Sequence, residues 1–290
     1  MKMETLQNKI DFAVVIAVRH ANPNGDPLNG NRPRETYEGY GEISDVCLKR
    51  KVRNRMQDLG SAVFVQSDDK CSDGFRSLKD RAKANPALEA ALKAKDREQY
   101  ARAACESWLD VRSFGQVFAF PKGKGGEKDE EVSVGVRGPV SIHPAFSVDP
   151  VIIDSLQITK SVNSVTGDKK TSDTMGSKHR VAFGVYTTFG SINCQLAEKT
   201  GFTQADAEVI RQALCTLFEN DASSARPDGS MEVLRVYWWT HNCKSGQYSS
   251  AKVHRLLKVE KRIEIPRSVE DYIITCGELE GLKCEVYDEF

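Results

Sequence analysis

The sequence of 290 residues contains no apolar run of the roughly 18 to 20 residues that a membrane-spanning helix needs. Its beginning, MKMETLQNK, has no apolar signal core, so we expect no export, no membrane association and a cytoplasmic protein. No internal repeat of solenoid period is visible, which argues against a repeat architecture. Hydrophobic residues make up 40% and charged residues 28%, as is typical of a soluble globular protein.

Cysteine pairs at metal-binding or redox spacing are also missing. The eight cysteines are scattered, and no Cys-x-x-Cys motif occurs, so we expect reduced thiols. The nearest candidate for a metal cluster is His241 with Cys243, to which only the distant Cys276 and Cys284 could add. Because the paired ligand spacing of a zinc site is absent, we expect neither a metal nor a cofactor.

The sequence has no net charge, since 41 Lys and Arg balance 41 Asp and Glu. Binding to a polyanion depends on local potential rather than on the sum, so the distribution of charge is more informative. A second basic stretch lies in residues 155–180, and acidic residues gather at 127–131 and from Glu278 onward. The densest basic group has no acid within it: Lys49, Arg50, Lys51, Arg53 and Arg55.

Hydrophobic patterning predicts several strands. Phe12–Val18 is a continuous, largely β-branched run that indicates a buried strand. Met231–Trp239 is rich in Val, Tyr and Trp, and alternation along it places Trp238 and Trp239 on opposite faces, where at least one should pack in a core. Further strand-like segments are Val111–Phe120, Val132–Val136, Ser141–Ile142, Val181–Phe189, Val253–Ile265 and Cys284–Tyr287.

Capping signals predict helices between these strands. Ser44 is a plausible N-cap and Gly60 a plausible stop, with an inward stripe between them. Thr203 and Asp206 form a capping-box pattern ahead of an apolar helix face. Residues 76–109 are rich in Ala, Lys and Glu and indicate a small helical insertion. The inward stripe consists of Leu48, Val52, Met56 and Leu59, and the second helix face of Val209, Ile210, Ala213, Leu214, Leu217 and Phe218.

The resulting order of strands and helices is typical of an α+β, ferredoxin-like core with two insertions. The second insertion would be a hairpin that starts near Leu156–Lys160 and has a polar tip over Ser161–Lys178. In such a fold helices cover one face of the sheet, and we expect the other face to be available for a ligand.

Several stretches together resemble a known family. NPNGDP (Asn22–Pro27) follows the first strand, and GEISDVCLKRKVR (Gly41–Arg53) opens the first helix. With LQITKSVN (Leu156–Asn163) and KHRVAFGVYTTF (Lys178–Phe189), these resemble the backbone subunits of type I-C CRISPR Cascade complexes, the Cas-seven family of the RAMP superfamily. The similarity covers nearly the whole chain, and the Ile-Ser-x-x-x-Leu-Lys-Arg-x-x-Arg helix start is its most specific part.

This resemblance implies a modified RNA-recognition (RRM-like) fold shaped like a hand. The palm would comprise residues 1–60, 111–154 and 181–290, with helical fingers at 61–110 and a thumb hairpin at 155–180. Copies would stack along one CRISPR guide RNA together with other Cascade subunits and help seat the target DNA strand. Cleavage would fall to a recruited helicase-nuclease, so the resemblance implies a subunit that is not an enzyme.

A guide RNA changes its sequence from spacer to spacer, so it must be held by its backbone. By resemblance, Ser44, Lys49 and Arg53 match family positions that touch the guide backbone, and Arg50 is a neighbouring candidate. Asp45 would stabilise the helix start but repel a phosphate. Further candidate contacts are Arg19, His20, Asn22 and Arg32 in the loop region and Lys160, Met175, Lys178, His179 and Arg180 on the flanks of the hairpin.

Two other functions stay open. A RAMP-type endoribonuclease acting on guide precursor or target RNA would need candidates such as Asp26 or His20, but Asp26 lies in a Gly-Asp-Pro turn that favours local hydrogen bonding. A lone messenger-RNA-binding module would carry an aromatic-rich Lys/Arg-Gly-Phe/Tyr strand, which this sequence lacks.

Overall fold

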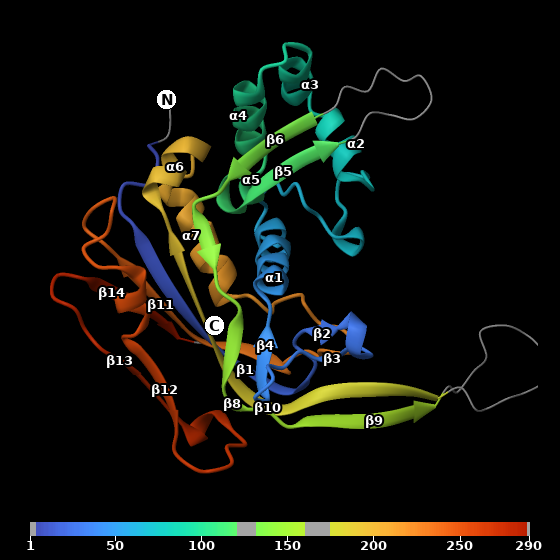
Figure 1. The fold of residues 1–290 in the computed structure, drawn as a ribbon, viewed down its shortest axis with the longest axis vertical. Coiled ribbons are helices and arrows are strands. Elements are labelled where there is room, and N and C mark those ends of the chain that lie inside the picture. Colours follow the sequence, from blue (N-terminus) through green and yellow to red (C-terminus); the bar gives the residue numbers. More distant parts are fainter. Residues whose placement is uncertain (1–3, 121–131, 160–174, 289–290) are drawn as a thin grey trace, which may run out of the picture.

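The computed structural model describes residues 4–120, 132–159 and 175–288 (Figure 1). Its central feature is an eight-stranded antiparallel sheet with the order β14-β11-β1-β10-β8-β4, in which β7 and β9 also pair with β10. The α+β class and the large antiparallel sheet agree with the sequence prediction, whereas the ferredoxin-like assignment and the domain bounds stay predictions. Within the described ranges, no helix combines the length and apolar composition that a membrane crossing requires.

The strands of the large sheet are β1 (Ile10–Ala21), β4 (Tyr40–Ile43), β7 (Val140–Ile142), β8 (Ala145–Pro150), β9 (Ile153–Thr159), β10 (Met175–Ile192), β11 (Met231–Thr240) and β14 (Lys283–Asp288). Three further pairs are β2 (Gly25–Asp26) with β3 (Arg32–Pro33), β5 (Gly115–Phe120) with β6 (Val132–Arg137), and β12 (Leu257–Lys261) with β13 (Tyr272–Cys276). The helices are α1 (Asp45–Asp58), α2 (Leu78–Lys83), α3 (Pro86–Lys93), α4 (Arg97–Ser107), α5 (Leu109–Phe114), α6 (Cys194–Thr200), α7 (Gln204–Cys215) and α8 (Ser250–His254).

Both faces of the sheet are covered along β1. Phe12, Val14 and Ile16 pack in one core with residues of α1 and α7, as predicted for a helix-covered face. The opposite face is not free, so that expectation is wrong: Ala13 and Val15 are also completely buried. They pack against the segment from α8 to β13, whose core residues are Val253, Leu257 and Tyr272.

The two tryptophans of β11 lie in the two cores, one on each face. Trp238 stacks on Phe12, with ring centroids 5.6 Å apart, in the helix-side core. Trp239 stacks on Tyr237 at 5.9 Å in the opposite core. Both rings are buried, which confirms the packing role predicted from strand alternation and removes them as candidates for base stacking.

The predicted helix boundaries are confirmed where the capping signals were strong. The Ser44 hydroxyl accepts a hydrogen bond from the Cys47 N–H, and Gly60 has φ +87° directly after α1. Thr203 and Asp206 form the predicted capping box of α7. The helical stretch expected over residues 76–109 is helical and consists of three helices, α2, α3 and α4.

Two predicted strands are wrong at their beginnings. Val111–Phe120 starts as helix α5 and turns into β5 only at Gly115, whose φ of +79° breaks the helix. Val253–Ile265 starts inside α8, because the Ser249 hydroxyl caps this helix, and its strand β12 ends at Lys261. Both segments begin with short apolar stretches, which periodicity alone cannot assign to a helix or a strand. The sequence prediction also missed α6, β2, β3, β4, β8 and β13.

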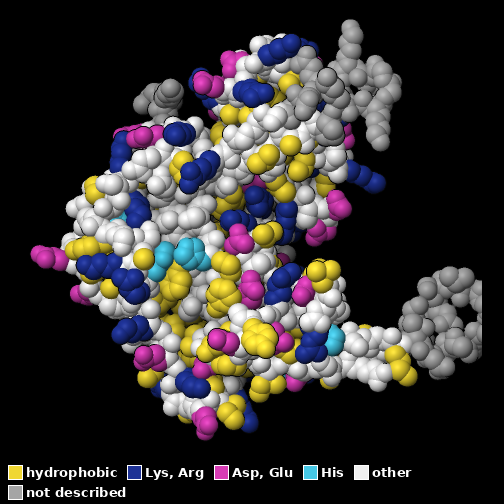
Figure 2. All heavy atoms as spheres, viewed as in Figure 1, with side chains coloured by type: hydrophobic (Ala, Val, Ile, Leu, Met, Phe, Trp, Pro, Cys, Tyr) yellow, Lys and Arg dark blue, Asp and Glu magenta, His cyan; other side chains and the backbone are white. Residues whose placement is uncertain are grey.

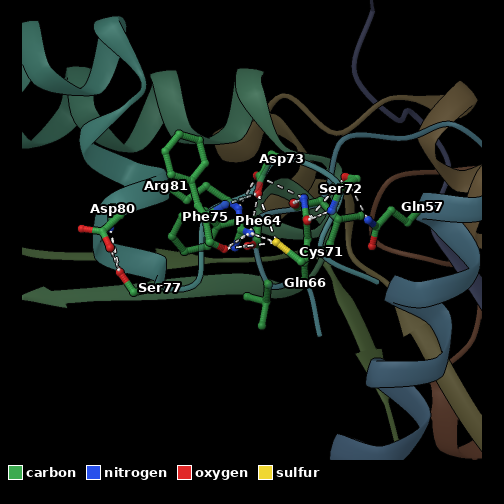
Figure 3. Close-up of polar contacts among 12 residues, drawn as sticks. Gln57, Phe64, Gln66, Cys71, Ser72, Asp73, Phe75, Ser77, Asp80 and Arg81 are labelled. Atoms are coloured by element: carbon green, nitrogen blue, oxygen red, sulfur yellow. Dashed lines mark hydrogen bonds and ion pairs between the residues drawn. The ribbon is translucent and has the colours of Figure 1, made fainter. Parts of the chain in front are cut away.

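The helical lobe, residues 62–120 and 132–137, lies at one end of the molecule (Figure 1). It has a core of its own around Phe64, Trp108 and Phe118. Figure 3 shows how the buried Arg81 organises the loop that leads into this lobe. Its guanidinium donates to the Asp73 carboxylate at 2.5 and 2.8 Å and to the carbonyls of Phe64 and Phe75 at 2.8 and 2.9 Å.

The predicted hairpin is formed by β9 and the first part of β10, which pair from Ile153 with Val181 to Thr159 with Met175. It extends from the sheet as an arm below α1 (Figure 1). The predicted tip, including the candidate Lys160, lies outside the described residues.

Candidate nucleic-acid interface

One loop connects the start of α1 with the base of the hairpin. At one end, the Asn24 side-chain oxygen accepts hydrogen bonds from the backbone N–H and the hydroxyl of Ser44, at 2.9 and 2.8 Å. At the other end, Arg32 Nη1 donates to the Ser155 hydroxyl at 2.9 Å. The buried Asn22 closes the loop on itself by donating to the Asn31 carbonyl at 2.7 Å. Residues that are far apart in the sequence thereby form one polar surface.

The hairpin root, which we define as Arg32, Ser155, Lys178, His179 and Arg180, contains four predicted site residues, of which Arg32 and His179 contact each other. His179 Nδ1 lies 2.9 Å from the Ser155 hydroxyl and 3.4 Å from Arg32 Nη1. Lys178 Nζ donates to the Ser224 carbonyl at 2.7 Å. Arg180 lies 3.5 Å from a carboxylate oxygen of Asp154.

The start of α1 presents a lysine whose ion pair is partly exposed. Lys49 Nζ lies 2.9 Å from the Asp45 carboxylate one turn earlier, and their side chains are 27% and 36% exposed. Water competes with such a pair, so Lys49 can exchange its partner for a phosphate at little cost. The Ser44 hydroxyl, by contrast, already donates to Asn24 and accepts from Cys47, so its local role is that of a cap.

Arg50 and Arg53 point from α1 into the helical lobe. Arg50 Nη1 donates to the Val65 carbonyl at 2.6 Å. Arg53 Nε donates at 3.1 Å to the buried Asp110, and its guanidinium lies 5.0 Å from the centroid of the Phe114 ring. Asp110 in turn accepts from the N–H groups of Phe64 and Val65 at 2.7 and 3.0 Å. These two arginines therefore join α1 to the lobe, a structural role that the sequence analysis missed.

The remaining basic residues of α1 are also engaged within the chain. The buried Lys51 forms an ion pair with Asp221 and lies over the Phe218 ring. Burial lowers the pKa of Lys51, and the Asp221 carboxylate counteracts this. Arg55 donates to the Thr216 hydroxyl at 2.7 Å and lies 3.6 Å from Asp58. The basic residues of α1 are therefore not all exposed to solvent. Most of them bind α1 to neighbouring parts of the chain.

Arg19 and His20 lie at a different surface. The Arg19 guanidinium is 5.5 Å from the Phe183 ring centroid, on the sheet face opposite α1. His20 has φ +51°, an unusual backbone conformation for a residue with a side chain. Both line a cavity of about 520 Å³ beneath the segment from Lys261 to Tyr272. The structure does not bring these two candidates together with those of α1.

Asn24 and Ser155 are contributors that the sequence prediction did not name. Asn24 lies inside the NPNGDP motif, and membership of that motif was the available signal. Ser155 has no sequence signal, because its importance comes from the pairing of β9 with β10. Asp26 accepts a hydrogen bond from the Leu28 N–H at 3.2 Å and lies 3.6 Å from Arg34, which is the local bonding expected of its turn.

Lys and Arg side chains gather over α1 on the face shown in Figure 2, in the hollowed region between the helical lobe and the hairpin arm. Among the described residues, no group of three or more His, Cys, Asp or Glu has metal-binding geometry. His241, a candidate ligand, instead contacts the buried Asp11 carboxylate at 2.8 Å.

Comparison with known proteins supports the family named in the sequence analysis, whereas the subtype stays a prediction. CRISPR-associated protein Cas7 of Haloferax volcanii is 27% identical over 292 residues, which cover 95% of this chain and 82% of that protein. Two solved structures align over 80% of this chain. One, a CRISPR RNA-guided surveillance complex, pre-nicking, has 16% identity, a TM-score of 0.48 and 78% of its chain covered. The other, a CRISPR RNA-guided surveillance complex, has 17% identity, a TM-score of 0.39 and 68% covered.

The family profile described as CRISPR-associated protein Cas7 matches residues 8–277, which is most of the chain. This chain therefore belongs to the Cas7 family.

Proposed function

We propose that the protein is a non-catalytic backbone subunit of a type I-C Cascade complex that binds CRISPR guide RNA by its sugar-phosphate backbone. Copies oligomerise along the guide with other Cascade subunits and support recognition of the target DNA strand, and a recruited helicase-nuclease then cleaves the target. The observation that carries this proposal is the loop that joins the start of α1 to the hairpin root.

The hairpin root has the electrostatics that a phosphate requires. The Arg32 guanidinium contacts the Ser155 hydroxyl and the His179 imidazole. Among the described residues, no carboxylate forms an ion pair with it. A guanidinium in this state retains N–H donors and full charge, which suits bidentate binding of a phosphate. Lys49 supplies a second exchangeable cation.

Length dependence of RNA binding tests the proposal. Purified protein is mixed with guide RNAs of two unrelated spacers and of increasing length, and the complexes are separated on native gels. A backbone subunit should give a ladder of bound copies that grows with RNA length and is the same for both spacers. A single complex at every length would instead indicate a lone RNA-binding module, and strong preference for one spacer would contradict backbone binding.

The endoribonuclease alternative receives no support from the candidate residues. Asp26 is engaged by its own turn, and His20 lines the cavity on the other face of the sheet, so the described structure shows no contact between them. Incubation with labelled repeat RNA and target RNA provides the test. Cleavage that disappears in Asp26→Ala or His20→Ala would overturn the non-catalytic proposal.

A further inference from the structure

Two cysteines flank the short loop that connects β13 with β14. Cys276 is the last residue of β13, and Cys284 lies near the start of β14. The strand β13 belongs to the small β12–β13 sheet, whereas β14 is at one end of the large sheet. Both thiols are free and half-buried, and both pack against the core on the sheet face opposite α1. The pair therefore lies where two separate sheets meet.

The sulfur atoms of this pair lie within hydrogen-bonding reach of each other. The loop between the two strands is held by bonds to a neighbouring segment. At its start, the Gly277 N–H donates to the Leu256 carbonyl at 2.9 Å. Near its tip, the Tyr248 hydroxyl donates to the Glu280 carbonyl, also at 2.9 Å. Because the backbone is fixed in this way, joining the two sulfur atoms requires rotation of the side chains and no rearrangement of the loop.

The surroundings give the two thiols different reactivity. Burial raises the pKa of both, that of Cys284 to about 12. A hydrogen bond from the Cys284 thiol acts in the opposite direction on Cys276, because it stabilises the Cys276 thiolate. The Cys276 sulfur also lies on the exposed side, 3.5 Å from the Gly277 carbonyl. Since the thiolate is the attacking species in thiol–disulfide exchange, Cys276 is the thiol that reacts first.

We infer that Cys276 and Cys284 form a two-thiol redox site whose substrate is a low-molecular-weight disulfide such as oxidised glutathione. Cys276 gives its proton to solvent, and its sulfur attacks one sulfur of the small disulfide. The S–S bond of the small disulfide breaks, and one small thiol leaves after taking up a proton. The Cys284 sulfur, deprotonated in turn, attacks the Cys276 sulfur and displaces the second small thiol. Two protein thiols are thereby oxidised to one disulfide, and the small disulfide is reduced to two thiols.

The new bond joins the β12–β13 sheet covalently to the large sheet. The segment from α8 to β13 covers one face of β1 through Val253, Leu257 and Tyr272, so the bond restricts the separation of this cover from the sheet. The closed loop is short, and the equilibrium constant for unfolding should therefore fall by about 30-fold, near the low end of disulfide effects. The reaction needs no RNA, so it goes beyond the proposed function and can be measured separately from it.

Incubation of the reduced, full-length protein with oxidised glutathione tests the inference. Peptide mapping should find Cys276 linked to Cys284. The variant Cys284→Ser should instead stop with glutathione on Cys276, because the second thiol is missing. Cys243→Ser is the matched control, since Cys243 is also half-buried and has Cys194 near it, and this variant should form the same link as the wild type. A wild type in which both thiols stay free, or in which glutathione stays on Cys276, would overturn the inference.

Urea unfolding shows whether the bond holds the two sheets together. The oxidised wild type should have an unfolding constant about 30-fold lower than the reduced wild type, and a thiol reductant should reverse the change. Cys276→Ser treated with the same oxidant should show no change, since each variant is compared only with its own reduced form. Equal unfolding constants for the linked and the reduced wild type would contradict the role of the bond between the sheets.

Discussion

Arg32 and His179 are 147 positions apart in the chain, yet Arg32 Nη1 lies 3.4 Å from His179 Nδ1, and the Ser155 hydroxyl contacts both. The contact exists because β9 pairs with β10 and because the NPNGDP loop folds back against this hairpin. It joins a loop residue and a hairpin residue that the sequence had suggested only as separate RNA contacts. In the proposed function this pair is one phosphate-binding unit.

We therefore predict that Arg32→Ala and His179→Ala weaken RNA binding by similar factors for unrelated spacers. In Arg32→Ala the slope of log affinity against log salt should also fall by about 0.7 to 1, because the lost cation releases fewer counterions. Fluorescence anisotropy at several salt concentrations measures both quantities. Arg97→Ala on the outer part of the helical lobe is the control and should leave affinity and slope unchanged. A loss confined to one spacer would contradict the assignment.

Lys49→Ala and Arg53→Ala should differ in stability although both residues are RNA-binding candidates. Lys49 forms an exposed pair with Asp45, which contributes about 0.3 to 0.5 kcal/mol. Removal of Arg53 leaves the carboxylate of Asp110, only 1% exposed, without its cation and should cost about 3 kcal/mol. Urea unfolding measures the difference, and equal losses would contradict the role of Arg53 in joining α1 to the lobe.

The same two variants also separate RNA binding from folding. Lys49→Ala should weaken RNA binding for all spacers while the protein stays folded. If Arg53→Ala is still folded at the assay temperature, its RNA affinity shows whether Arg53 contributes beyond its structural contact. Unchanged affinity in Lys49→Ala would remove the start of α1 from the interface.

The parts of the fold that could be predicted depend on local signals. Ser44, Thr203 and Asp206 identified helix starts because a side chain near the backbone N–H groups determines a cap. The prediction for Val111–Phe120 failed because its first residues are too few to distinguish a helix from a strand, and Asp110 at their start bonds the distant backbone at Phe64 and Val65. That contact spans more than 40 positions and leaves no local trace in the sequence.

The candidate site shows the same limit. The sequence located the basic residues of α1 but could not show that Asp221 engages Lys51 or that Asp110 engages Arg53, since both acids lie far away in the chain. It also grouped Arg19 with Asn22 by proximity, whereas strand alternation directs Arg19 to the opposite face. Charge density along a sequence therefore predicted where cations are and not which of them are free.

Arg81→Met should loosen the loop before α2 without unfolding the large sheet. The change removes the bonds to Asp73, Phe64 and Phe75 seen in Figure 3 and should cost about 2 kcal/mol, because the freed Asp73 is partly exposed and regains water. Hydrogen exchange should accelerate in residues 66–77. The hydrogen bond from Arg81 lowers the pKa of Asp73 to about 2, so this pKa should rise in the variant. The exposed Arg76→Met is the control and should change neither quantity.

His254 should make the stability of the protein fall below about pH 6.5. Burial lowers the pKa of His254 below its ordinary value, while its bond to the Gly190 carbonyl and the nearby Asp11 act in the opposite direction. His143 and Lys9 also face it and disfavour a further positive charge. As the pH falls, the unfolded state therefore binds a proton that the folded state does not bind, and folding loses free energy.

The loss should begin near the unfolded pKa of about 6.5 and amount to no more than about 1.4 kcal/mol per pH unit. His254→Gln keeps a donor for the Gly190 carbonyl but cannot take up the proton. Urea unfolding of both proteins at about pH 7 and about pH 5 should show a smaller pH effect in the variant. Asp11 does not confuse the comparison, since its lowered pKa places its own loss of stability below about pH 4. Equal pH effects in the two proteins would show that His254 titrates alike in its folded and unfolded states and would contradict the prediction.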